Sequence, residues 1–343
     1  MEESRKDAAA GDSLLGPKLK RRLFAGVLFG VVVYAAFALW ADGPGIARSM
    51  KGFPLRWIAA ACGLSTLNYC VRFLRWERYR AILGIRMPAI VSFRIYLAGL
   101  ALTVTPGKMG EAFRSVLIRR QDGTPIARSA PMVVAERFTD LLGFLLLVAV
   151  GGIASQPDYL WVFWGTLALC AVLLVLVGSR KAGEAGVALW ARLPWVGSFA
   201  EHARSALESS RELLRFQELF LPTLLSTVGW GLECCAFYLI AEALVPGAVD
   251  LEFATFTFAL SAIVGAVLIV FPGGLGVTEA SMGGLLTARF EAFGLASSAA
   301  AAQALSATFL IRLCTLWWAV VLGGAALFVH GRLERRAARL PQS

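Results

Sequence analysis

The chain has 343 residues, 58% of them hydrophobic and only 16% charged. Soluble domains carry about 25% charged residues, so this composition excludes an ordinary soluble domain and indicates a polytopic membrane protein. The formal net charge of +10 is typical of the Lys and Arg excess in the cytoplasmic loops of membrane proteins. Because no basic stretch interleaves aromatic residues, we expect no nucleic-acid partner.

The first 20 residues are polar and charged, and an apolar run at 22–40 follows them. This run is long enough to cross a bilayer, so it predicts a retained first span rather than a cleaved signal peptide. We expect three regions: a polar cytoplasmic N-terminal segment at 1–20, one transmembrane domain at 21–330, and a basic C-terminal tail at 331–343.

The rest of the domain consists of apolar runs with one more polar connector. The run at 91–104 is too short to span a membrane alone. In residues 180–216, Phe199, Ala203 and Ala206 recur at helical spacing, which predicts an amphipathic connector along the cytoplasmic surface. The longer predicted helices cover 22–40, 55–84, 129–153, 159–178, 218–244, 251–271 and 297–330.

The distribution of Lys and Arg predicts the topology. Basic residues gather at the two ends of the chain, at 78–86, at 119–128 and in the amphipathic connector, whereas the loops at 155–158 and 246–252 contain none. The positive-inside rule then places both termini in the cytoplasm, and only the loop at 41–56 departs from the pattern.

The sequence TPGKMGEAFR at 105–114 interrupts an apolar run with helix breakers and charges. In the predicted topology, helix 55–84 ends and helix 129–153 begins on the cytoplasmic side. Residues 89–128 must therefore enter and leave the membrane on that side, with the motif at the tip of a re-entrant hairpin. Non-helical backbone at such depth is tolerated only where it is buried or lines a wet cavity.

A second motif, FPGGLGVTEAS at 271–281, repeats this pattern and enters from the opposite side. Two broken segments of opposite orientation are typical of an inverted-repeat transporter with its site near the midplane, although one Pro-Gly segment alone also fits an ordinary kink or loop. The predicted fold is an all-α polytopic bundle with two inverted re-entrant hairpins. Its helix-breaking residues are Pro106, Gly107, Gly110, Pro272, Gly273, Gly274 and Gly276.

Several ionisable residues lie inside the predicted membrane segments, where each costs about 2.5–3.5 kcal/mol at a helix centre. They should face a polar interior, in which arginine suits a phosphate because it binds one in bidentate fashion. Internal salt bridges that only join helices are the alternative, and they are favoured for Glu233. Arg72 and Arg75 are expected to snorkel to the interface. The candidate substrate-binding residues are Glu111, Arg114, Glu136, Arg137, Asp140, Glu279 and Arg312.

Catalytic and metal-binding residues are not expected. The six cysteines lie in apolar runs and form no CxxC pair, which favours small buried side chains over disulfides or metal ligands. The two histidines, His202 and His330, lie in basic connecting or terminal segments. We therefore expect no histidine-based centre, no metal and no cofactor.

The blocks TPGKMGEAFR, AERFTD and FPGGLGVTEAS, together with RFLRW near the end of the second helix, resemble a known group. This is the flippase-like integral membrane family related to the transmembrane region of lysylphosphatidylglycerol synthases, and the resemblance covers about residues 20–330. It implies a multi-pass protein of the bacterial inner membrane that moves lipids or lipid-linked sugars between leaflets. The motif positions carried over are Gly107, Gly110, Glu111, Arg114, Glu136, Arg137, Asp140, Gly273, Gly274, Gly276 and Glu279.

The favoured function is a lipid translocator rather than an enzyme. The synthases carry a soluble aminoacyl-transfer domain, which we do not expect here because the chain ends at Ser343, just past the last helix. Arginines would hold a phosphate-bearing lipid or polyprenyl-phosphate-linked sugar, and Glu111 and Glu279 would bind a cation, a proton or sugar hydroxyls. No GxxxxGK[ST] motif is present, so ion coupling or downhill flow is expected rather than ATP. A membrane-embedded transferase acting on a lipid carrier and a structural subunit are the alternatives.

Overall fold

The computed structural model describes residues 52–103, 109–153, 156–181, 183–184, 200–267 and 276–337. All regular secondary structure in these residues is helical, which confirms the predicted all-α class. The predicted first span at 22–40 and parts of both helix-breaking motifs, residues 105–108 and 271–275, lie outside them. Within the described residues, the helices long and apolar enough to cross a membrane are Pro157–Gly178, Phe216–Leu244 and Ser297–Leu333.

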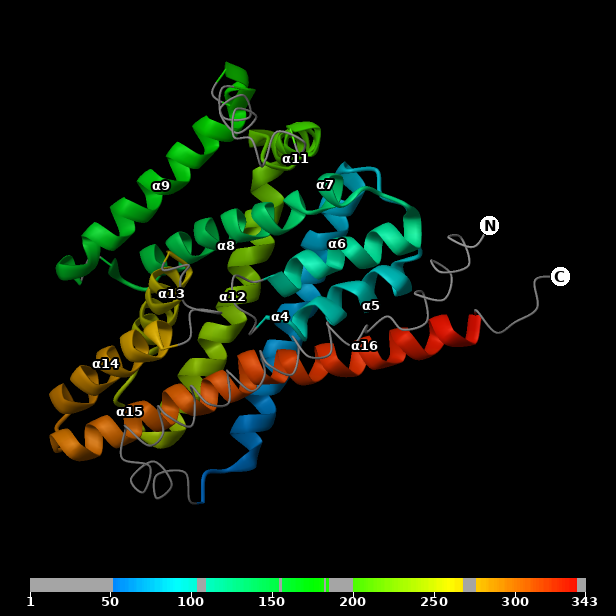
Figure 1. The fold of residues 1–343 in the computed structure, drawn as a ribbon. Coiled ribbons are helices and arrows are strands. Elements are labelled where there is room, and N and C mark those ends of the chain that lie inside the picture. Colours follow the sequence, from blue (N-terminus) through cyan, green and yellow to red (C-terminus); the bar gives the residue numbers. More distant parts are fainter. Residues whose placement is uncertain are drawn as a thin grey trace, which may run out of the picture.

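Helices α4 (Leu55–Ile82) and α12 (Phe216–Leu244) pack along one another at the centre of the bundle (Figure 1). Helix α4 carries Asn68, Arg72 and Arg75, which are unsuited to lipid. All three side chains are buried, because they face α12 and the neighbouring helix α8. The polar side of α4 is thus enclosed within the bundle.

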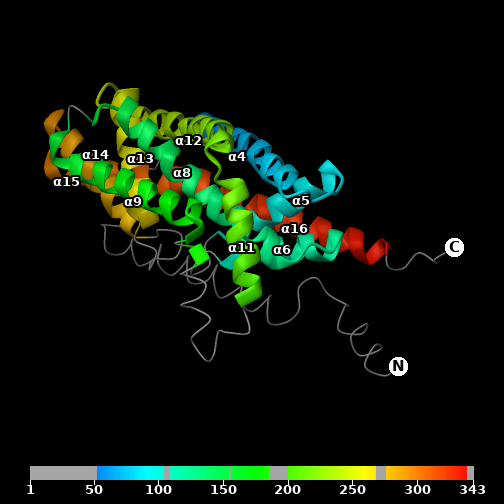
Figure 2. The ribbon, with the colours of Figure 1, turned by 90° about the horizontal axis from the view of Figure 1, so that it is seen from above.

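Helix α8 (Pro131–Val150) follows the one-turn helix α7 (Ile126–Ser129) and contacts α12 and α13 (Leu251–Val267). Seen from above, it lies between α12 and α9 (Leu160–Gly178), which follows a 3-10 turn at Pro157–Tyr159 (Figure 2).

The close contact between α8 and α12 depends on Gly143. A Cβ atom at Gly143 would lie 3.1 Å from the backbone nitrogen of Thr227. The charged residues of α8 therefore reach the centre of the bundle.

The helices that flank each predicted break are short and pack against each other. Helix α5 (Ala89–Leu100) contacts α6 (Met109–Asp122), and α13 contacts α14 (Val277–Ala292). Each is shorter than the roughly 20 residues that a span needs. Residues 104–108 and 268–275, which join them, lie outside the described residues, so the re-entrant geometry stays a prediction.

One long helix passes both pairs of short helices. It runs through α15 (Ser297–Arg312), a π-helical segment (Leu313–Trp317) and α16 (Trp318–Ala337). Because α15 packs on α14 and α16 packs on α5, the pairs lie toward opposite ends of this helix (Figure 1). π-helical turns are frequent at functional sites; here the hydroxyl of Tyr69 donates to the carbonyl oxygen of Thr315 at 2.6 Å.

Helix α11 (Ala200–Leu213) lies within the segment for which an amphipathic connector is predicted, and it contacts α7, α8 and α9. Arg211 donates to the carbonyl oxygens of Val177 at 3.0 Å and Ser179 at 3.2 Å, so it caps the end of α9. The rest of the predicted connector, residues 185–199, lies outside the described residues.

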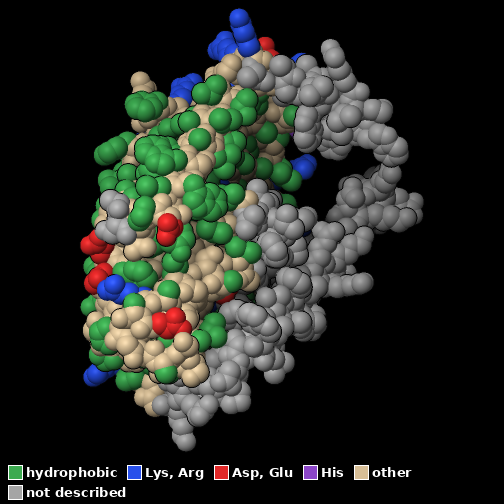
Figure 3. Space-filling model, turned by 90° about the vertical axis from the view of Figure 1, so that its left-hand side faces the viewer, with side chains coloured by type: hydrophobic (Ala, Val, Ile, Leu, Met, Phe, Trp, Pro, Cys, Tyr) green, Lys and Arg blue, Asp and Glu red, His purple; other side chains and the backbone are tan. Residues whose placement is uncertain are grey.

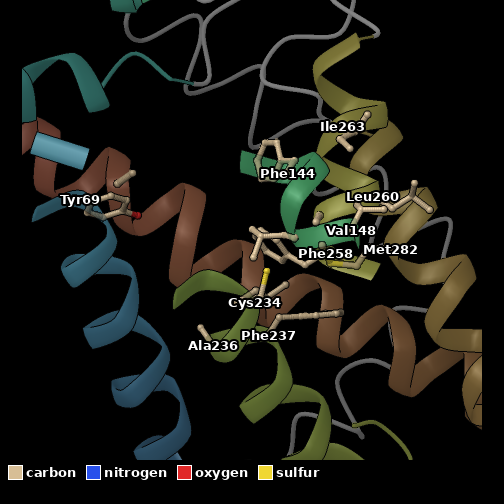
Figure 4. Close-up of a cluster of buried hydrophobic side chains, with 14 of the residues drawn as sticks. Tyr69, Phe144, Val148, Cys234, Ala236, Phe237, Phe258, Leu260, Ile263 and Met282 are labelled. Atoms are coloured by element: carbon tan, nitrogen blue, oxygen red, sulfur yellow. The ribbon is translucent and has the colours of Figure 1, made fainter. Parts of the chain in front are cut away.

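The helices have two apolar regions, one on the outside of the bundle and one in its core. On the outside, Trp161, Trp164 and Val175 of α9 are each more than half exposed, and hydrophobic side chains dominate the face in Figure 3. Such a face suits contact with lipid chains. Inside, Phe237 of α12 and Phe258 of α13 gather with neighbouring apolar side chains in the core, with their ring centroids 6.0 Å apart (Figure 4).

Because α16 packs closely on α5, we expect substitution by alanine to affect stability differently at two adjacent glycines of α16. A Cβ atom at Gly323 would lie 2.2 Å from the backbone nitrogen of Ala101, whereas a Cβ at Gly324 would meet nothing within 4 Å. We expect Gly323→Ala to destabilise the protein by about 1–3 kcal/mol through overpacking. Gly324→Ala should be neutral or stabilise by up to about 1 kcal/mol, because alanine favours helix. Thermal unfolding of both variants in detergent tests this, and equal midpoints would contradict it.

Candidate functional site

Asp140 of α8 is the centre of a buried charge cluster. Its Oδ1 accepts hydrogen bonds from Arg75 Nη1 at 2.6 Å, Ser226 Oγ at 2.7 Å and Trp230 Nε1 at 2.8 Å. Its Oδ2 lies 3.5 Å from Arg72 Nη2 and 3.4 Å from Arg137 Nη1. Three guanidinium groups around one carboxylate leave an excess of positive charge in the middle of the bundle.

The expectation that Arg72 and Arg75 snorkel to the interface is wrong. Arg75 is 0% and Arg72 is 8% exposed, and both bind Asp140. The guanidinium of Arg72 also stacks over the Trp230 ring, 4.7 Å from its centroid. The sequence does carry a signal for this arrangement: Asn68, Arg72 and Arg75 recur at helical spacing, so they form one polar face of α4.

A second buried pair joins α6 to α8. Arg114 Nη1 and Nη2 donate to Glu136 Oε1 and Oε2 at 3.2 and 2.7 Å, a bidentate arrangement. The Arg114 guanidinium also lies over the rings of Trp76 and Tyr96, at 4.8 and 5.6 Å. Gly99 makes room for it, because a Cβ there would lie 2.5 Å from Arg114 Cδ.

A third pair joins α14 to α15. Arg312 Nε donates to Glu279 Oε1 at 2.6 Å, and Glu279 Oε2 accepts the backbone N–H of Gly276 at 2.6 Å. Gly276 has a φ of +88°, a conformation that favours glycine, so it turns the chain directly before α14. Glu279 therefore caps the helix that follows the second break.

The remaining predicted site residues lie at the edges of the described residues or outside them. Gly110 lies in the first turn of α6, and Glu111 follows it in the same helix. The side chain of Glu111 is not among those described. The helix-breaking residues that lie wholly outside the described residues are Pro106, Gly107, Pro272, Gly273 and Gly274.

A cavity of about 130 Å³ opens beside the charge cluster. Side chains from α4, α5, α8 and α12 to α16 enclose it. Thr103 and Thr278, which lie just outside the two undescribed breaks, are both on its wall. Its other polar lining residues are Tyr69, Arg72, Arg137, Glu233, Arg312 and Thr315.

The cavity brings together only part of the predicted site. Arg137 and Arg312 line it, whereas Asp140 and Glu279 lie behind them as their ion-pair partners. The Arg114–Glu136 pair is not part of the wall. Most of the described charges among the predicted site residues thus form ion pairs. Three arginines from three helices face the cavity: Arg72, Arg137 and Arg312.

Among the described residues Glu233 has no salt-bridge partner, although the sequence favours an internal salt bridge for it. It is 4% exposed, lines the cavity and accepts a hydrogen bond from Asn68 Nδ2 at 2.6 Å. Among the described residues no arginine or lysine lies within ion-pair distance of its carboxyl group. The reason is geometric: Arg72, one turn after Asn68 on α4, binds Asp140 instead.

Comparison with known proteins gives a consistent result over most of the chain. Residues 27–323 match the family described as the lysylphosphatidylglycerol synthase TM region. The UPF0104 membrane protein PH1989 of Pyrococcus horikoshii is 24% identical over 338 residues, which cover 90% of this chain and 97% of that protein. A UPF0104 membrane protein of Methanothermobacter thermautotrophicus is 27% identical over 316 residues, covering 85% and 89%.

A bacterial relative extends the comparison. The inner membrane protein YbhN of Escherichia coli is 25% identical over 279 residues, covering 79% of this chain and 80% of that protein. The apolar helices, the inward-facing charges and these matches agree with an integral multi-pass membrane protein. The chain belongs to the lysylphosphatidylglycerol synthase TM region family, together with the UPF0104 membrane proteins and YbhN.

Proposed function

We propose that this protein is a lipid translocator that moves a phosphate-bearing lipid or a lipid-linked sugar between the leaflets of a bacterial inner membrane. The observation that carries the proposal is the cavity faced by Arg72, Arg137 and Arg312. Arginine pairs with phosphate through two parallel N–H···O bonds, and such bonds are strong where water is scarce. The head group would occupy the cavity while the acyl or prenyl chain stays in the bilayer.

Arg72 is the strongest candidate for direct contact with the phosphate. Its Nε is buried and has no hydrogen-bond partner among the described residues, and its longer contact with Asp140, at 3.5 Å, leaves donor capacity. A buried guanidinium nitrogen without a partner costs free energy that a bound anion would recover. Arg75, by contrast, binds Asp140 at 2.6 Å and does not line the cavity.

The short helices support a transport role. Helices α6 and α14 each begin directly after a predicted break, so their N-termini carry partial positive charge near the membrane interior. Broken helices of this kind form substrate sites in inverted-repeat transporters. We propose that both pairs, α5–α6 and α13–α14, are re-entrant hairpins and that both termini lie in the cytoplasm. A location in the inner membrane is supported by the name of the Escherichia coli relative.

Leaflet transfer in proteoliposomes tests the proposal. Fluorescent phospholipid and polyprenyl-phosphate-sugar analogues are scored by quenching of the outer leaflet, and their masses are measured afterwards. We expect one lipid class to be transferred with its mass unchanged. Conversion of the lipid to a new mass would instead favour the membrane-embedded transferase.

Arg72→Gln should reduce this transfer about tenfold or more, since a hydrogen bond to a charged group contributes about 1.5–3 kcal/mol. Asp140 keeps its shorter bond to Arg75, so the variant should still fold. Arg78→Gln is the matched control, because Arg78 lies on the same helix but binds the half-buried Glu218 away from the cavity. Equal loss of transfer in both variants would contradict phosphate binding by Arg72.

A further inference from the structure

We propose that Glu233 is a proton-binding group on the cavity wall and that its protonation is coupled to binding of the anionic head group. The coupling rests on the proposed translocation, whereas the proton site stands on its own contacts. From the sequence, Glu111 and Glu279 are expected to bind a cation, a proton or sugar hydroxyls, but Glu279 caps α14 and binds Arg312. Among the described residues, Glu233 neither caps a helix nor pairs with an arginine.

The contacts of Glu233 differ from those of the other buried acids near the cavity. Asp140, Glu136 and Glu279 each bind an arginine at 2.6 or 2.7 Å. Within the described residues, Glu233 receives one hydrogen bond, from an uncharged amide. Burial without a counter-ion favours the neutral form of a carboxyl group, so the contacts of Glu233 suit a group that takes up a proton.

The Asn68 amide can serve both protonation states of Glu233. Its Nδ2 donates to the carboxylate, while its Oδ1 is buried without a hydrogen-bond partner in the described structure. If Glu233 takes up a proton, rotation of the amide would let Oδ1 accept the new O–H. Gly229, one turn before Glu233, leaves room beside the amide, since a Cβ there would lie 2.6 Å from Oδ1.

The charges around Glu233 provide the coupling. On α4 the ionisable groups facing the cavity are Arg72 and Tyr69, and on α8 they are Arg137 with Asp140 behind it. Helix α15 supplies Arg312, with Glu279 of α14 behind it. On its own helix, Glu233 is followed by the buried thiol of Cys234. The lining residues from α5, the turn that follows it, α13, α16 and the π-helical segment are uncharged: Leu100, Thr103, Phe258, Ala262, Gly265, Ala266, Thr315, Leu316 and Ala319.

From these surrounding charges we expect the proton and the anion to bind together. With the cavity free of anion, the arginines favour the carboxylate form of Glu233. A bound phosphate offsets their charge, which favours proton uptake from cavity water onto a carboxyl oxygen of Glu233. By reciprocity, protonation of Glu233 strengthens phosphate binding by the same factor. The lipid and the proton would therefore cross the membrane in the same direction.

Infrared difference spectroscopy of the purified full-length protein between about pH 5 and pH 9 tests the proton site directly. We expect a carboxylic-acid carbonyl band that titrates within this range, disappears in Glu233→Gln and persists in Glu242→Gln. Glu242 is the matched control because it lies on the same helix but binds the exposed backbone N–H of Gly247. A titrating band that survives in Glu233→Gln, or no such band in the unmodified protein, would overturn the site.

Binding of short-chain phosphatidylglycerol, a phosphodiester probe, tests the coupling and can be followed by the fluorescence of Trp230 and the other tryptophans. Above the titration of Glu233, affinity should fall by up to about tenfold per pH unit, because one proton binds with each anion. Glu233→Gln should bind with an affinity that does not change with pH. Retention of the pH slope in Glu233→Gln would refute the coupling.

A proton gradient across proteoliposomes separates the two proposals. We expect the gradient to accelerate lipid transfer by the unmodified protein and by Glu242→Gln, but not by Glu233→Gln. Transfer that ignores the gradient in every protein would refute the coupling and leave the translocator intact. Absence of transfer at any pH, with the infrared band present, would refute the translocator and leave the proton site intact.

Discussion

Asp140→Asn is expected to destabilise the protein by about 3–5 kcal/mol, the range found when one partner of a buried ion pair is removed. Asparagine keeps one acceptor oxygen but loses the negative charge that faces Arg72, Arg75 and Arg137. Arg75 is 0% exposed, so water cannot replace the lost counter-charge. Against a total stability of about 5–15 kcal/mol, this loss leaves a marginal protein.

Equilibrium unfolding in mixed micelles with increasing SDS measures the effect of Asp140→Asn. Asp250→Asn is the control, because Asp250 also binds an arginine, Arg289 at 3.2 Å, but its side chain is 61% exposed. Its Oδ1 accepts the backbone N–H of Phe253 at 2.7 Å, and asparagine can keep that bond. An exposed pair contributes about 0–1 kcal/mol. If the two variants unfold alike, the charge cluster does not hold the bundle together.

The positions of the helices could be predicted well from hydrophobic runs. The run at 55–84 corresponds to α4, and the run at 218–244 corresponds to α12. The predicted helix at 297–330 is present as one long helix, although its π-helical segment has no evident sequence signal. Local patterns suffice here because a spanning helix satisfies its own backbone hydrogen bonds and needs only apolar length.

The partners of the buried charges were harder to predict, because they come from distant parts of the chain. Asp140 binds Arg75 across 65 residues of sequence, and Glu233 binds Asn68 across 165. Spacing along one helix identifies a polar face but not which helix it meets. For this reason the sequence predicts an interfacial position for Arg72 and Arg75 and a salt bridge for Glu233, and the structure shows neither among the described residues. Arg137 and Arg312 lie deep in apolar runs, and this depth does predict an inward-facing position.

The pairs next to the two breaks share an organisation that the sequence motifs only partly indicate. In the first pair the helix after the break supplies the arginine, Arg114, whereas in the second it supplies the acid, Glu279. Both pairs fasten a short helix to a longer neighbour. The ion pairs of Arg114 and Glu279 therefore position the helices around the cavity. The described charged residues that face the cavity lie outside the two break motifs: Arg72, Arg137, Glu233 and Arg312.

Glu136→Gln is expected to cost about 3–5 kcal/mol, because it leaves the guanidinium of Arg114 buried opposite a neutral amide. Both side chains are nearly inaccessible, at 2% and 4% exposure. Glutamine has one acceptor oxygen where glutamate has two, and its amide N–H₂ would face a guanidinium donor. The stacking of Arg114 on Trp76 should remain but cannot replace the lost charge.

Glu212→Gln separates the effect of burial from that of geometry. Glu212 accepts Arg128 Nη1 and Nη2 at 2.9 and 2.7 Å, so the pair is bidentate like that of Glu136 and Arg114. Its side chains are 31% and 30% exposed, and water can solvate either partner when the other is changed. We expect Glu212→Gln to cost about 1 kcal/mol or less. Both variants are measured by SDS unfolding; a loss for Glu212→Gln as large as that for Glu136→Gln would show that bidentate geometry, and not burial, sets the strength of these pairs.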